Sequence, residues 1–156
     1  MELKSKFLAT IFNIKRIQSQ SNINPAHLNL GDFITGNFFH NHNDSSLTLK
    51  TQFGNLHFSF LYNDLAIFYA DYLEKSLLVT DNSVLIRQVF EQLVEGYQSQ
   101  VNHSIDLELF KFLCLFQLQL KIIDQKSNKT HEESSKRFFE NAYLDLYDLD
   151  VCFLKF

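Results

Sequence analysis

Residues 46–71, SLTLKTQFGNLHFSFLYNDLAIFYAD, constrain the fold more than any other stretch of the chain. Two dipeptides in it, Gly54-Asn55 and Asn63-Asp64, stand between runs in which apolar residues alternate. Dipeptides of this kind favour two-residue turns between antiparallel strands. The stretch therefore predicts a meander of three antiparallel strands.

The two turns also predict which residues pair. The expected pairs are Phe53 with Leu56, Thr51 with Phe58, Leu49 with Phe60 and Leu47 with Tyr62, followed by Tyr62 with Leu65, Phe60 with Ile67 and Phe58 with Tyr69. All of them fall on one face, so a slip of one residue would turn the whole apolar set to solvent.

The second face of this meander is half apolar. Its apolar residues are Leu61 on the second strand and Ala66, Phe68 and Ala70 on the third. An uncovered apolar patch marks an interface more often than a plain surface. We therefore expect these four residues to bind a partner or to form a homodimer around a two-fold axis, unless a helix covers them.

Amphipathic helices are predicted near residues 2–20, 83–97 and 131–146. In the first, Leu3, Phe7 and Ile11 recur at helical spacing, although residues 10–17 also alternate as a strand would. The third begins at a capping box, Thr130 to Glu133.

Residues 105–123 are apolar almost all round as a helix but alternate well as a strand. The phase of the alternation changes, which favours two strands, or one strand with a bulge near residues 110–114; residues 105–113 are left open between strand and helix. Further strands are expected at residues 32–39 and 76–80. The predicted fold is α+β, an antiparallel sheet at 46–80 and 105–123 packed by the three helices, in a single domain over residues 1–156.

Composition supports a packed globular protein. The 156 residues are 46% hydrophobic and 15% aromatic, which is enough to bury a core. Cys114 and Cys152 both stand in apolar runs without a Cys-x-x-Cys pattern, so we expect free buried thiols. The N-terminal residues show no signal peptide, and no run reaches the roughly 20 apolar residues of a membrane span. These observations predict a soluble, cytoplasmic protein.

Charge is distributed unevenly along the chain. Residues 1–50 hold five basic and three acidic groups, whereas residues 51–156 hold nine basic and fifteen acidic ones, for a net charge of −4. A nucleic-acid-binding protein normally has a strongly basic face, so this class is disfavoured. An acidic surface is better suited to a basic protein partner.

One loop has the residue types of a metal site. His40, His42 and Asp44 follow a His-x-His-x-Asp pattern, which can present two imidazoles and a carboxylate to one metal ion. The pattern resembles the start of the metal-binding motif of metallo-β-lactamase-type hydrolases, which implies a metal-dependent hydrolase. The resemblance covers five residues, and Ser45 stands where that family has a further histidine. We expect no cofactor and treat the three residues as an alternative.

The C-terminal helix ends in an acidic concentration. Asp145, Asp148 and Asp150 lie within six residues of one another, at spacings that match no calcium loop. They are expected to form a solvated helix end or an acidic rim that binds a basic partner.

No nucleophile motif, phosphate-binding loop or Cys/His signature is present. The order of elements is similar to that of the small acidic chaperones of type III secretion, which implies a dimer that wraps an effector segment. An immunity protein or other inhibitor that covers the active site of a toxin fits the same features. The sequence thus favours a non-enzymatic module that masks one partner protein over the alternative, a hydrolase using His40, His42 and Asp44.

Overall fold

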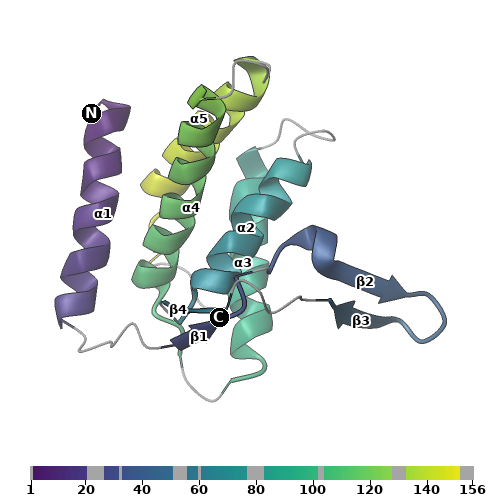
Figure 1. Ribbon diagram of the computed structural model, residues 1–156. Helices are drawn as coiled ribbons and strands as arrows, with labels where there is room; N and C mark the ends of the chain where they lie inside the picture. Colours follow the sequence, from purple (N-terminus) through teal and green to yellow (C-terminus); the bar gives the residue numbers. More distant parts are fainter. Residues whose placement is uncertain are drawn as a thin grey trace.

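The computed structural model describes residues 2–20, 27–31, 33–50, 56–59, 61–76, 83–101, 104–127 and 133–151. The fold is α+β and consists mainly of helices (Figure 1). Its elements in chain order are α1 (Leu3–Gln20), β1 (His27–Asn29), η1 (Thr35–Asn37), β2 (Phe38–Asn41), β3 (Ser46–Leu49), β4 (His57–Ser59), α2 (Asn63–Ser76), α3 (Ser83–Gln98), α4 (Leu107–Ser127) and α5 (Glu133–Asp148).

The three amphipathic helices are confirmed as α1, α3 and α5. In α1 the buried residues Thr10, Ile14 and Ile17 recur at intervals of four and three, so helical spacing prevails over the alternation of residues 10–17. Residues 130–132 of the predicted capping box lie outside the described residues.

The predicted meander is wrong in its third strand, because residues 63–76 form helix α2. Its buried apolar residues Ala66, Tyr69, Ala70 and Leu73 are spaced by three, one and three residues, which is the period of a helix. Asp64 acts at the start of this helix: its carboxylate accepts hydrogen bonds from the backbone amides of Leu30, at 2.7 Å, and Gly31, at 3.0 Å. The supposed second turn is therefore a helix start.

The predicted strand pairing is also wrong. Strand β3 pairs with β2, so Leu47 lies opposite His40 and Leu49 lies opposite Phe38. Strand β4 pairs with β1, with Phe58 opposite Leu28. Both sheets are antiparallel and two-stranded. The first predicted turn, Gly54-Asn55, and residues 77–80 of the predicted strand 76–80 lie outside the described residues. The strand predicted at 32–39 is wrong over residues 35–37, which form the 3-10 helix η1, and only Phe38 and Phe39 belong to a strand, β2.

The strands predicted at 105–123 are wrong as well, because a single helix, α4, runs through this stretch. It contacts α1, α2 and α5, and thus lies at the centre of the helices (Figure 1). A central helix is apolar on nearly every side since it has neighbours on nearly every side. The apparent change of phase in the sequence arises because apolar residues lie on each of these buried sides.

The helices form two layers, with α1, α4 and α2 side by side at the front of Figure 1 and α5 and α3 behind them. Between these layers lies the core, whose largest fully buried side chains include Tyr69, Phe90, Phe110, Phe139 and Tyr143. The β2–β3 hairpin projects from beside the middle of α2 (Figure 1) and is anchored by ring contacts of Phe38 with Phe33 and Phe68.

Candidate functional site

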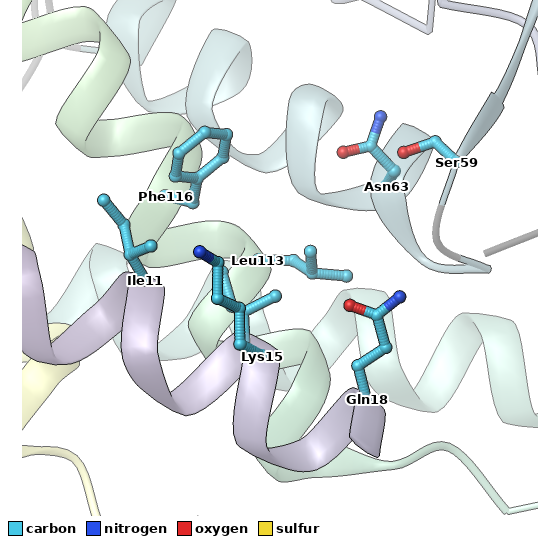
Figure 2. Close-up of a pocket in the computed structure, with 8 residues that line it drawn as sticks. Ile11, Lys15, Gln18, Ser59, Asn63, Leu113 and Phe116 are labelled. Atoms are coloured by element: carbon cyan, nitrogen blue, oxygen red, sulfur yellow. The ribbon is translucent and has the colours of Figure 1, made fainter. Parts of the chain in front are cut away.

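A pocket of about 260 Å³ lies between α1 and α4, beside the start of α2 (Figure 2). Its lining residues are Ile11, Ile14, Lys15 and Gln18 of α1, Ser59 of β4, Asn63 of α2, and Leu113 and Phe116 of α4. The apolar side chains lie where α1 and α4 meet, and the polar groups of Ser59 and Asn63 form the opposite wall. The pocket is therefore an apolar hollow with one polar side.

Local structure explains these positions. Ile11, Lys15 and Gln18 recur at helical spacing, so they form one side of α1, next to the side that packs into the core. Asn63 is held at the first residue of α2, where its side-chain oxygen accepts a hydrogen bond of 3.3 Å from the amide of Gln117.

Exposed apolar side chains continue the pocket along both helices. Leu8 precedes Ile11 by one turn and has 64% of its surface exposed. On α4, Leu120 and Ile123 follow Phe116 by one and two turns and are 44% and 49% exposed. We call the pocket-lining Ile11 and Phe116 together with Leu8, Leu120 and Ile123 the α1–α4 surface.

Both stripes of the α1–α4 surface run in the same direction from the pocket, because α1 and α4 are antiparallel. The ion pair of Arg16 with Glu108, at 2.7 Å, joins the C-terminal end of α1 to the N-terminal end of α4. Phe12 follows Ile11 on α1 and is 69% exposed, so it adds apolar area beside the α1–α4 surface. Large exposed apolar areas of this kind mark binding surfaces.

Lysines stand beside the apolar residues on α1. Lys15 lines the pocket, and Lys4 lies eleven residues earlier, three turns along the same side of the helix. Both are exposed, and neither has a carboxylate within ion-pair distance among the residues that the structure describes. This edge is basic in a chain whose net charge is −4.

The predicted acidic end is exposed, as Asp145 and Asp148 lie on the outer side of the end of α5 and Asp150 follows it. Asp148 forms an ion pair of 2.9 Å with Lys6 of α1, whose ammonium also lies 4.4 Å from the centre of the Tyr147 ring. Part of the acidic charge is thus compensated within the chain.

The predicted apolar patch is not a surface. Ala66 and Ala70 are buried in the core side of α2, and Leu61 packs against the core. Phe68 lies on another side of α2, where its ring contacts Phe33 and Phe38. A strand period puts Ala66, Phe68 and Ala70 on one face, whereas the helix keeps Ala66 and Ala70 together and turns Phe68 to another side.

His40 and His42 lie next to each other in the structure, whereas Asp44 bonds to Ser46 instead of joining them. The two imidazole Nδ1 atoms are 3.3 Å apart on the exposed hairpin. Hydrogen bonds from the hydroxyl and backbone amide of Ser46 lower the pKa of Asp44, the amide at 2.9 Å, so this carboxylate serves the turn. Within the described ranges, no three His, Cys, Asp or Glu side chains are close enough to hold a metal ion.

Other polar groups inside the protein are structural. Tyr143 and Thr10 share a buried hydrogen bond of 2.6 Å that links α5 to α1, and burial raises the pKa of Tyr143 to about 12. Burial also raises the pKa of the Cys114 thiol, the free buried thiol expected from the sequence. A thiol with a raised pKa is a poor nucleophile. Cys152 lies outside the described residues.

None of the comparisons, with protein-family models, with curated proteins or with solved structures, gave a match to this chain. No helix among the described residues has the length and apolar character needed to cross a membrane.

The α1–α4 surface was not predicted from the sequence, although α1 carries a signal for it. Leu8 and Phe12 lie outside the stripe formed by Phe7, Ile14 and Ile17. Large apolar residues beyond the width that one core contact needs indicate a second contact. On α4 no such signal exists, because apolar residues occur on nearly every side of this helix.

Proposed function

We propose that this chain is a non-enzymatic, cytoplasmic protein-binding module that masks one partner protein, in the manner of a secretion chaperone or an immunity protein. The observation that carries the proposal is the α1–α4 surface. It exposes large apolar side chains next to a pocket into which an apolar side chain of the partner fits. Interfaces draw most of their binding energy from a few such anchors buried in pockets.

The size of the pocket favours a protein over a small molecule. Sites that enclose small ligands usually measure about 300–1,000 Å³, whereas this pocket is about 260 Å³ and lies open between α1 and α4. Its amide and hydroxyl groups, those of Asn63, Ser59 and Gln18, lie at one side and end, and the ammonium group of Lys15 lies beside Ile11 and Phe116 (Figure 2). A side chain that enters from a partner meets apolar walls formed by Ile11, Leu113 and Phe116.

The acidic end supplies a second contact in this proposal. Asp145, Asp148 and Asp150 are exposed and lie on a different part of the molecule, at the end of α5. A basic segment of the partner would be steered toward them, since complementary charges raise the rate of association.

Photo-crosslinking in the native cells tests the proposal. A benzophenone amino acid is placed at Leu120, at Asp145 or, as a control, at Gln92, an exposed residue of α3. We expect one predominant protein crosslinked from position 120 and none from position 92. Equal crosslinking from all three positions, or crosslinks from none, would contradict a dedicated partner.

The identified partner then separates the two kinds of masking protein. A chaperone is expected to hold its client segment unfolded, so the client's amides exchange with solvent quickly outside the contact. An immunity protein is expected to bind a folded enzyme and to abolish its activity at a one-to-one ratio. Hydrogen exchange and an activity assay of the partner distinguish the two.

A further inference from the structure

We propose that the α1–α4 surface receives an amphipathic α-helix of the partner whose carboxylates face Lys4 and Lys15. This inference rests on the proposed function and specifies the chemistry of the partner at that surface. It is argued from the direction of the apolar stripes, the hydrogen bonding of the surrounding backbone, and the position of the two lysines.

The apolar stripes on α1 and α4 are matched by a straight segment of the partner with regularly spaced apolar residues. On α4, Phe116, Leu120 and Ile123 extend over seven residues, which is about 10 Å of helix. On α1, Ile11 and Leu8 run in the same direction. A helix that presents apolar residues at positions i, i+4 and i+7 has matching spacing, as in other helix-in-groove complexes.

The backbone hydrogen bonding of α1 and α4 favours a helical occupant over an extended peptide. Along the interiors of α1 and α4, the helices that form this surface, the backbone groups bond to each other, so they offer no row of donors and acceptors. An extended segment laid there would have unpaired N–H and C=O groups against apolar side chains, which is costly. A helix satisfies its own backbone.

The lysines determine the charge of the occupant. Lys4 and Lys15 flank Leu8 and Ile11 on the same side of α1, and no described carboxylate neutralises them. On the far side of α4, Lys121 is already paired with Glu74 of α2. An incoming helix therefore meets uncompensated positive charge only along its α1 edge, where glutamate or aspartate is complementary. At the end of α5, Asp148 is already paired with Lys6, at 2.9 Å, on the side of α1 opposite to Lys4. Exposed charges that lie more than a Debye length apart, about 8 Å at physiological salt, are largely screened.

Two displayed peptide libraries test the inference directly. Each peptide has 20 residues with leucine or phenylalanine fixed at i, i+4, i+7 and i+11, and with Glu, Gln or Lys allowed at the flanking positions. The second library is identical except for a central proline, which breaks the helix. Selection is carried out on the full chain and on its Leu120→Glu variant, which changes an exposed side chain and whose fold is checked by circular dichroism.

We expect enrichment on the wild-type chain from the first library alone, with Glu concentrated along one flank. Binding of the enriched peptides should fall at least tenfold on Leu120→Glu, and similarly on the independent variant Phe12→Glu. Equal enrichment from the proline library, a flank without preference for Glu, or no enrichment at all would overturn the inference.

Charge exchange gives the sharper control. The double variant Lys4→Glu, Lys15→Glu keeps every apolar residue, so peptides rich in flanking Glu should bind at least about threefold more weakly and peptides rich in Lys should gain, since the reversal of two exposed charges replaces attraction by repulsion. Unchanged affinities for both peptide sets would overturn the assignment of the flank.

The crosslinking experiment keeps this inference separate from the proposed function. A partner crosslinked at position 120 whose contact segment is extended, by hydrogen exchange, supports masking and overturns the helix. A second copy of this chain crosslinked at position 120, with a dimer by light scattering, overturns the inference too. Enriched acidic helices without any crosslinked partner would support the chemistry of the surface while contradicting the proposed function.

Discussion

Helix α4 has two apolar stripes of nearly the same composition and opposite surroundings. Leu115, Leu118 and Ile122 form one and are fully buried, on the side from which Lys111 reaches α5. Phe116, Leu120 and Ile123 form the other, and the last two keep almost half of their surface exposed. The comparison teaches that an apolar side chain favours burial, but that it is buried within the chain only where a neighbouring helix packs against it.

The largest expected effect is on the free energy of unfolding, when one leucine of each stripe is replaced by alanine. Leu118→Ala removes a side chain with no exposed surface and should lower the free energy of unfolding by about 2–5 kcal/mol. Leu120→Ala, two residues on and 44% exposed, should cost about 1 kcal/mol or less. Urea denaturation measures both, and equal losses would mean that the second stripe is covered in solution.

A second experiment uses pH to probe the covered side. Tyr143 has its pKa raised from 10.0 to about 12 by burial, so folding favours its neutral form. Its contribution to stability is complete below pH 10 and is lost as the pH rises from 10 through 12, by at most about 2–3 kcal/mol. Denaturation at pH 9 and pH 11 should show the decline, and Tyr143→Phe should reduce it.

The stability of the Tyr143→Phe variant at neutral pH provides the control. Thr10 retains a hydrogen bond of 3.1 Å to the carbonyl oxygen of Lys6, so the variant should lose only about 0.5–1.5 kcal/mol. A decline in stability above pH 10 that is as steep in the variant as in the wild type would assign it to other tyrosines, of which Tyr69 also has a pKa raised by burial.

A smaller effect is expected at the acidic end, which is exposed but charged. Replacing Asp145, Asp148 and Asp150 by lysine removes the ion pair of the exposed Asp148 with Lys6 and places a second ammonium group near Lys6, which should lower the free energy of unfolding by about 1 kcal/mol. The association rate with the partner should fall and lose much of its dependence on salt. An unchanged rate would exclude this end from the interface.

The smallest effect concerns the hairpin. Micromolar zinc or manganese should leave the melting temperature unchanged, because Asp44 bonds to Ser46 and, among the residues that the structure describes, only His40 and His42 remain as neighbouring ligands. A rise of several degrees that His42→Ala abolishes would contradict this expectation and favour the hydrolase alternative, since a ligand of the native state must stabilise it.

Sequence patterns predicted the elements that have one clear apolar stripe. Residues 83–97 and 131–146 separate apolar from polar sides, and helices α3 and α5 begin and end within two residues of the predicted bounds. The prediction failed at α2 and α4. In α2, aromatic and apolar residues stand at nearly every position from Leu65 to Leu73, so a period of two and a period of 3.6 both fit.

The site depends on information that a single helix does not contain. Lys15 and Gln18 become pocket residues only because α4 packs beside α1 and Asn63 lies at the start of α2. These contacts join segments about 50 to 100 residues apart, and no local pattern specifies them. The acidic end was predictable because an exposed charge at a helix end needs no partner to be recognised.

The central position of α4 also has a consequence during synthesis. Helix α1 is complete at Gln20, but the helix that buries its apolar side ends at Ser127. At about 5–20 residues per second, the ribosome needs roughly 5–20 s to add the intervening residues. Throughout that interval Phe7, Ile14 and Ile17 have no α4 to pack against. The nascent chain is therefore expected to occupy ribosome-associated chaperones until α4 and α5 have left the exit tunnel, and to fold only then.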